Sequence, residues 1–274
     1  VSRVVAAIAD PNPQVAGKGL AMLSAAGIRT ESGLLETEAR ELNRGFLSRI
    51  ERGRPFVRLK CAASLDGKTA LSDGLSQWIT GEAARHDVQI LRAESCAVLT
   101  GIGTVLADDP QLNVRAFPTL RQPLRIVLDS RLRLPPTAKL LADPASPVLL
   151  LTAVPPEKYP AALAAVPHLD ILTVPAADGR ISLPAVLTLL AERGIGELLV
   201  EAGATLCGAF LQADLADEIV LYQAGKILGG NARSLFDLPE NPAALQQPAS
   251  WQTRSVTILD GGDLKQVLRK KEAV

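Results

Sequence analysis

The chain has 274 residues, of which 47% are hydrophobic but only 3% aromatic, and its lysines plus arginines equal its aspartates plus glutamates at 29 each. This length suits one large domain, or one domain with an appendage, and the balanced charge argues against a surface that coats nucleic acid. Cys61, Cys96 and Cys207 lack the close pairs of a zinc site and the density of a secreted scaffold, so we expect a reduced, cytoplasmic protein without a membrane span.

The first 52 residues predict a small βαβ piece followed by a helix. "VSRVVAAIAD" is strand-like, "GKGLAMLSAAG" has a helical apolar period, "IRT" is a short strand, and "LETEARELNRGFLSRIER" is helical. Such a fragment is too small to bury a good core alone. Because Val1 already lies inside a strand-like run, we expect either an upstream segment that was removed or not recorded, or a GTG start codon, which is also written as valine.

From Arg54 onward, strand-like runs alternate with helix-length segments, which is typical of a largely parallel sheet covered by helices. The expected strands are "FVRLKCAAS", "CAVLTG", "LRIVLDS", "PVLLLTA", "LDILTVP", "ELLVEAG" and "EIVLYQAGKIL", and the expected helices are "GEAARHDVQILRAES", "LPAVLTLLAERG" and "ATLCGAFLQAD". Near the end, "RSVTILDGGDLKQVLRK" predicts an antiparallel hairpin around "DGG". Between the last expected parallel strand and this hairpin, the segment Pro239–Ser250 is rich in proline and polar residues, which predicts an irregular surface connection.

The stretch "GIGTVLADDPQLNVR", Gly101 to Arg115, follows an apolar strand and reads as a glycine-containing loop. The carboxyl ends of strands are where open α/β sheets bind ligands. Because the charges of this stretch are mixed, it suits a ligand that carries both hydrogen-bond donors and an anion.

A second strand end, "ELLVEAGATLCGAF", delivers Glu201 and Gly203 to the start of a helix. The free N–H groups and dipole of a helix start attract a pyrophosphate, and glycine lets the backbone approach it closely. An ordinary strand-to-helix turn is the alternative, since the spacing does not match the G-x-G-x-x-G fingerprint.

Other residues leave two interpretations open. Lys60, inside an otherwise apolar strand, is either a cation directed at a ligand or an edge lysine facing water. Ser130 and the arginines after "LRIVLD" either accept a ribose 2′-phosphate or form a solvated loop. Trp78 is either a ligand contact or an ordinary indole. His86 and His168 lack partner signals, and we expect both to be structural.

Seven blocks occur in the order that marks one family: "LKCAASLDGKTA", "SQWITG", "LRAES", "GIGTVLADDPQLNVR", "LRIVLDS", "VEAGATLCGAF" and "GKILGGNAR". Through them the chain, from Val1 to about Lys271, resembles the bifunctional riboflavin-biosynthesis deaminase–reductase. The resemblance implies an α/β, dihydrofolate-reductase-like domain over residues 53–274, with a mostly parallel central sheet, helices on both faces and an antiparallel C-terminal hairpin. It also implies NADPH-dependent reduction of 5-amino-6-(5-phosphoribosylamino)uracil, a small-molecule substrate, to the ribitylamino compound by hydride transfer to ribose C1′, and a homodimer.

The same resemblance implies that residues 1–52 are the C-terminal remnant of a zinc deaminase domain. The H-x-E and P-C-x-x-C blocks that would bind its zinc are absent from these residues. We therefore expect no bound metal and no deaminase activity in this chain.

Carried onto this sequence, the resemblance implies a catalytic group of Lys60, Asp108 and Glu201, in which Lys60 supplies charge or a proton, Asp108 lies near the transfer and Glu201 grips the pyrimidine. It implies substrate contacts at Ser76, Arg92, Leu112, Arg115 and Glu201. It implies cofactor contacts at Ala62, Trp78, Thr104, Asp108, Ser130, Gly203, Ala204, Thr205, Leu206, Cys207, Gly208 and Ala209. Two alternatives stay open: a reductase of another substrate on the same fold, and a non-catalytic assembly module.

Overall fold

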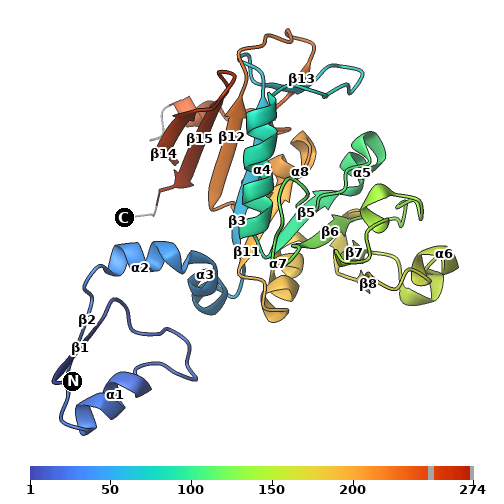
Figure 1. Cartoon of the computed structure of the whole chain (residues 1–274). Coiled ribbons are helices and arrows are strands. Elements are labelled where there is room, and N and C mark those ends of the chain that lie inside the picture. The colour runs from blue at the N-terminus through green and yellow to red at the C-terminus, as the bar shows by residue number, and fades with distance from the viewer. Residues whose placement is uncertain (246–249, 272–274) are drawn as a thin grey trace. The chain divides into compact units, whose positions relative to one another are not determined.

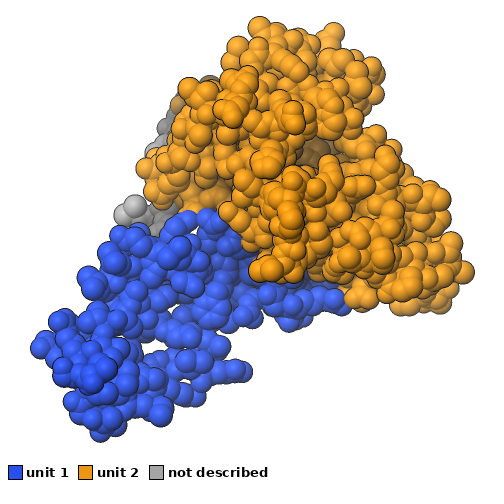
Figure 2. All heavy atoms as spheres, in the orientation of Figure 1, with its two compact units in different colours: residues 1–56, 187–197 blue, residues 57–186, 198–274 orange. Residues whose placement is uncertain are grey.

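The computed structural model describes residues 1–245 and 250–271, with the helices and strands arranged as in Figure 1. The chain forms two compact units, shown in different colours in Figure 2. The first comprises residues 1–56 and 187–197, and the second comprises residues 57–186 and 198–274. Among the residues described, no helix has the length and apolar character that crossing a membrane requires.

The first unit contains a parallel two-stranded sheet connected through a helix. Its elements are β1 (Arg3–Ala6), α1 (Lys18–Ala25), β2 (Arg29–Ser32), α2 (Glu36–Leu42) and α3 (Arg44–Arg52). The βαβ order is as predicted, but the single helix expected over residues 35–52 is two helices. Asn43 separates them, because it leaves the helical conformation and its side-chain Nδ2 donates a hydrogen bond to the carbonyl of Ala39 at 2.8 Å.

The centre of the second unit is a nine-stranded sheet in the order β14-β15-β12-β3-β11-β5-β6-β7-β8. Its strands are β3 (Phe56–Ala63), β5 (Ala97–Gly101), β6 (Leu124–Leu128), β7 (Val148–Thr152), β8 (Leu169–Thr173), β11 (Glu197–Glu201), β12 (Glu218–Gln223), β14 (Trp251–Ile258) and β15 (Leu264–Lys270). β12 is parallel to β3, and β5 to β8 are parallel to one another, whereas β15 is antiparallel to both β12 and β14. The predicted α/β sheet with an antiparallel C-terminal hairpin is confirmed.

Helices lie on both faces of this sheet, with α4 (Glu82–Glu94) in front of it in Figure 1 and α8 (Ala204–Gln212) behind it. Val88 and Leu91 of α4 pack against Leu199 and Val220 of the sheet in one buried cluster. The remaining elements are α5 (Ile102–Asp108), α6 (Ala161–Ala164), α7 (Leu183–Glu192), β4 (Lys68–Ala70), β9 (Ala176–Ala177), β10 (Arg180–Ile181) and β13 (Arg233–Ser234), with 3-10 turns at Lys139–Leu141, Pro156–Lys158 and Pro242–Leu245.

The stretch after β5 differs from the expected loop, because its first half is the helix α5. Gly101 is extended and precedes the helix, and Ile102 and Val105 are buried in an apolar cluster with Val127. Burial of this apolar pair stabilises a short helix that its glycines alone would not favour. Asp109, in the left-handed conformation, ends it.

Candidate active site

Most of the predicted site residues lie at or near the carboxyl ends of four neighbouring strands, β3, β11, β5 and β6. Lys60 lies opposite Val220 in the parallel pair of β3 and β12, and Val220 packs in the cluster under α4. Leu199 packs in the same cluster, so Glu201, two residues further along β11, lies on the same face. Lys60 and Glu201 are therefore both on the α4 face of the sheet.

Glu201 forms a bidentate ion pair with Arg92 of α4. The Arg92 Nε atom is 2.6 Å from Glu201 Oε1, and Nη2 is 2.8 Å from Oε2. Both residues are buried, at 7% and 9% exposure. Burial alone would raise the pKa of Glu201, but the charge and hydrogen bonds of Arg92, with the charges of Lys60 and Arg115, bring this pKa below its usual value. The carboxylate is therefore held ionised.

Positive charge exceeds negative charge around this pair. Burial and the charge of Arg92 lower the pKa of Arg115, although Glu201 acts in the opposite direction. Lys60 and Arg115 both act electrostatically on Glu201, and Arg115 is exposed. Three cations around one carboxylate suit an anionic ligand, and arginine in particular binds phosphate in a fork geometry.

The segment between α5 and Arg115 is held in place by the predicted Arg92 and by Gln89, which the sequence did not single out. The Asn113 carbonyl accepts a hydrogen bond from Arg92 Nη1 at 3.0 Å, and the Arg115 N–H donates to Gln89 Oε1 at 3.0 Å. Leu112 has a φ of 57° and is buried in the cluster under α4. Its side chain is thus part of the core, so only its main chain is placed to contact a ligand.

Arg125 of β6 is a further buried residue behind this segment. Its guanidinium donates hydrogen bonds to the carbonyls of Gln111, Leu140, Asp143 and Ser146. Burial lowers the pKa of Arg125 to about 10, with the charge of Asp143 opposing that shift. An arginine in the apolar run "LRIVLDS" was the available sequence signal, because a buried charge needs partners of this kind.

On the other face of the sheet, α8 begins directly after β11. A side chain on Gly203, before the first turn, would meet nothing within 4 Å. The backbone N–H groups of such a start can bind an anion that approaches from this open space. Of the predicted cofactor run, Ala204, Leu206 and Ala209 are half-buried and Thr205 is exposed.

Two members of that run instead pack inside the protein. Cys207 is 1% exposed and hydrogen-bonds with the thiol of Cys61, and this bond together with burial raises the pKa of Cys61. A Cβ atom on Gly208 would lie 2.3 Å from the carbonyl oxygen of Asp237. Glycine at this position is therefore explained by close packing.

The loop after β6, which contains Ser130, is organised by its neighbour Asp129. The buried carboxylate of Asp129 accepts backbone N–H groups of Arg133 at 2.5 Å and Leu134 at 2.8 Å. Ser130 is half-buried, and the Arg131 side chain next to it is exposed. Hydroxyl and guanidinium donors therefore occur together at this strand end.

Ser76 and Asp108, predicted on the substrate and cofactor sides respectively, lie beside one another. The Ser76 hydroxyl is 3.4 Å from Asp108 Oδ1. Trp78 is 60% exposed, and the guanidinium carbon of Arg85 is 4.5 Å from its ring centroid. Ala62 and Thr104 are both half-buried.

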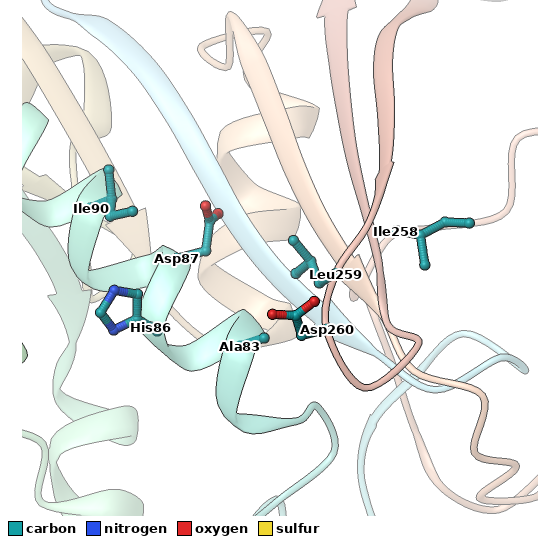
Figure 3. Close-up of a pocket in the computed structure, with 7 residues that line it drawn as sticks. All are labelled: Ala83, His86, Asp87, Ile90, Ile258, Leu259 and Asp260. Atoms are coloured by element: carbon teal, nitrogen blue, oxygen red, sulfur yellow. The ribbon is translucent and has the colours of Figure 1, made fainter.

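A pocket elsewhere on the second unit contains none of the predicted site residues (Figure 3). It lies between α4 and the turn of the C-terminal hairpin, and its lining consists of Ala83, His86, Asp87, Ile90, Ile258, Leu259 and Asp260. Asp87 there already accepts hydrogen bonds from Lys265 at 2.6 Å and from Tyr222. His86 packs against Phe117 with ring centroids 5.9 Å apart. We therefore assign the candidate active site to the carboxyl ends of the strands and not to this pocket.

In comparison with known protein families, residues 55–259 match the family described as RibD C-terminal domain. The riboflavin biosynthesis protein RibD of Escherichia coli K12 is 45% identical over 251 residues, which cover 87% of this chain and 67% of that protein. A structure of Acinetobacter baumannii RibD has a TM-score of 0.88 at 43% identity, covering 99% of this chain and 74% of that one. A Thermotoga maritima structure has a TM-score of 0.84 at 31% identity, covering 99% and 72%, and is described as a diaminohydroxyphosphoribosylaminopyrimidine deaminase and 5-amino-6-(5-phosphoribosylamino)uracil reductase.

Proposed function

The chain belongs to the family of RibD C-terminal domains, the reductase part of RibD, and we propose that its strand-end site uses NADPH as the reductant. It is a riboflavin-biosynthesis oxidoreductase, a 5-amino-6-(5-phosphoribosylamino)uracil reductase that takes a nicotinamide cofactor. The observation that carries our assignment of the site is the buried Arg92–Glu201 pair, with Lys60 and Arg115 beside it.

The open helix start fits the pyrophosphate of a dinucleotide. The pyrophosphate would lie in the open space beside Gly203 and bind the free N–H groups that follow this residue. Thr104, in α5 at the end of the neighbouring strand β5, would contact the part of the cofactor next to the pyrophosphate. Ser130 and Arg131 would donate to the ribose 2′-phosphate that distinguishes NADPH from NADH. When bound, the cofactor supplies a hydride.

The substrate lies, in our proposal, on the α4 face of the sheet. The ionised Glu201 accepts N–H groups of the pyrimidine, and the exposed Arg115 binds the ribose phosphate. Arg92, whose Nε and Nη2 are already bonded to Glu201, orients that carboxylate and adds positive charge beside the phosphate.

Lys60 and Asp108 have roles at the reacting carbon of the substrate. Reduction at ribose C1′ through a ring-opened imine adds a hydride to carbon and leaves an amine, so negative charge develops toward the nitrogen. The ammonium of Lys60 stabilises that change or donates the proton. Asp108, close to the Ser76 hydroxyl, fixes the position of the reacting groups.

Three wider assignments belong to the same proposal. Residues 1–52 correspond to the end of a deaminase domain: the reductase family match begins at residue 55, whereas the Thermotoga maritima structure described as a deaminase and reductase covers 99% of this chain. β14 is the outermost strand of the sheet among residues 1–245 and 250–271, and this fits a homodimer, since edge strands pair readily with another chain. The free thiols of Cys61, Cys96 and Cys207 fit a reducing compartment such as the cytoplasm.

The test is a cofactor-oxidation assay with 5-amino-6-(5-phosphoribosylamino)uracil, comparing NADPH with NADH. We expect a higher kcat/KM with NADPH, and loss of that preference in Ser130→Asp, where a carboxylate would repel the 2′-phosphate. An unchanged preference would remove Ser130 from the pocket, whereas oxidation only with an unphosphorylated pterin would favour a different reductase. We also expect no ammonia release from the diamino precursor.

A further inference from the structure

The segment after β12, residues 225–238, is held to the loop after β3 along much of its length. We call this segment the strap. Its short strand β13 pairs with β4. On either side of that pairing, the Leu65 N–H donates to the carbonyl of Lys226 at 2.7 Å, and the Leu235 N–H donates to the carbonyl of Gly67 at 3.1 Å. The strap therefore has a defined position although it contains little regular structure.

Asp66 makes the main side-chain connection between these two segments. Its Oδ1 accepts hydrogen bonds from the Ser64 hydroxyl at 2.5 Å and the Leu228 N–H at 3.1 Å, and its Oδ2 accepts the Gly229 N–H at 2.7 Å. These hydrogen bonds lower the pKa of Asp66 to about 2, and the bond from the Ser64 hydroxyl has the largest effect. Both oxygens are thus engaged as acceptors, on an ionised carboxylate.

The strap in turn contacts Trp78 and the first turn of α8, both of which we propose as cofactor contacts. Near one end, the Lys226 ammonium donates to the main-chain carbonyl of Trp78 at 2.6 Å. Near the other end, Asp237 lies on the first turn of α8, where its N–H donates to the Ala204 carbonyl at 3.2 Å and its carboxylate accepts the Thr205 hydroxyl at 3.2 Å. A displacement of the strap would therefore reach both elements.

We propose that Asp66 is a positioning residue for the nicotinamide cofactor, acting through the strap on Trp78 and on the first turn of α8. This inference rests on the proposed function, because it takes these two elements as the cofactor side of the site. Asp66 needs no contact with the cofactor itself. Arg92 and Glu201 are held by one another and by Asn113, so this part of the substrate side does not depend on Asp66.

The direct test is Asp66→Asn. An asparagine of the same shape turns one acceptor oxygen into an NH₂ donor, which would then face the N–H of Leu228 or Gly229. We expect the Kd for NADPH to rise about tenfold or more, in line with the loss of charge-assisted bonds. The substrate KM at saturating NADPH should be unchanged. Asp73→Asn is the matched control, because Asp73 is exposed and accepts the N–H of Leu75 in its own loop.

Lys226→Met provides a second test that leaves Asp66 intact and removes the bond to the Trp78 carbonyl. NADPH binding should weaken here too, with the melting temperature close to that of the wild type. The inference is overturned if both variants bind NADPH like the wild type, if Asp66→Asn lowers only the melting temperature, or if substrate KM rises as much as the NADPH Kd. If the wild-type chain binds no NADPH, the proposed function fails first and this inference fails with it.

Discussion

Arg92 and Glu201, which are 109 positions apart in the chain, meet in a buried ion pair with contacts of 2.6 and 2.8 Å. The pair joins α4 to the end of β11 at the edge where the other predicted site residues gather. It links the substrate-binding role proposed for Glu201 to the stability of the fold.

Replacing Glu201 with glutamine should therefore affect both properties. The amide keeps the shape but loses the charge-assisted bonds, so we expect the free energy of unfolding to fall by about 1.5 to 3 kcal/mol. We expect kcat/KM for the substrate to fall about tenfold or more, with NADPH affinity retained. Urea unfolding and steady-state kinetics measure the two effects. Glu94→Gln is the control, since Glu94 is exposed and lies 3.8 Å from its partner Arg58. Wild-type turnover in Glu201→Gln would end the proposed role.

The stability of the fold should decrease as the pH falls into the acidic range. The pKa of Glu201 is lower in the folded chain than its unfolded value of about 4.3. Its ionised form therefore stabilises the fold above that pH, and the contribution is lost as the pH falls through the folded-state pKa. Asp66, with a folded pKa of about 2, acts in the same direction.

Chemical denaturation across pH measures this dependence. The free energy of unfolding should change little between about pH 7 and 5 and should fall from about pH 4 downward. In Glu201→Gln this fall should be shallower. Equal acid sensitivity of the two proteins would mean that the Arg92–Glu201 pair does not contribute to it.

Arg115 should act on substrate affinity without affecting the fold, because its side chain is exposed. Arg115→Ala is expected to raise the substrate KM about tenfold or more, the equivalent of one charge-assisted contact to phosphate. The Kd for NADPH and the melting temperature should not move. Arg121→Ala removes an exposed arginine from the same region and should behave like the wild type. A collapse of NADPH binding in Arg115→Ala would instead place this arginine on the nucleotide side.

Gly203, just before α8, and Gly208, within α8, should differ in their effect on stability. Gly203→Ala adds a methyl group to open space and should weaken NADPH binding at nearly unchanged stability. Gly208→Ala places the methyl group 2.3 Å from the Asp237 carbonyl oxygen, and such overpacking should cost about 1 to 3 kcal/mol. Calorimetry for both variants, with NADPH titration, distinguishes these effects. Equal losses of stability would contradict the assignment of Gly203 to the cofactor.

Local patterns predicted much of this fold, because burial on both sides of a parallel strand leaves a continuous apolar run. β5, β6, β7 and β11 were found in this way, and the "DGG" turn predicted the hairpin of β14 and β15. The features that were not predicted are the helix break at Asn43, the helix α5, and the short elements β4, β9, β10, β13 and α6. The helix break at Asn43 depends on one side-chain hydrogen bond, and α5 depends on tertiary burial of Ile102 and Val105.

For the site, the sequence could indicate single residues but not their pairing. Glu201 was predicted from its strand end, yet its bond to Arg92 joins segments that only the folded sheet brings together. Asp66 lies in the block "LKCAASLDGKTA" but was not predicted as a site residue, since its partners are mainly backbone N–H groups of the distant strap. Gly208 belonged to a motif, but its packing against Asp237 shows a different reason for glycine.

The most direct measurement follows the hydride itself. NADPH deuterated at the transferable C4 position is incubated with the chain and 5-amino-6-(5-phosphoribosylamino)uracil, and the product is analysed by mass spectrometry and NMR. Our account predicts one deuterium at C1′ of the ribitylamino product for each NADPH oxidised, and none from deuterated water at that carbon. Label that enters C1′ from solvent, or NADPH oxidation without a ribitylamino product, would contradict it.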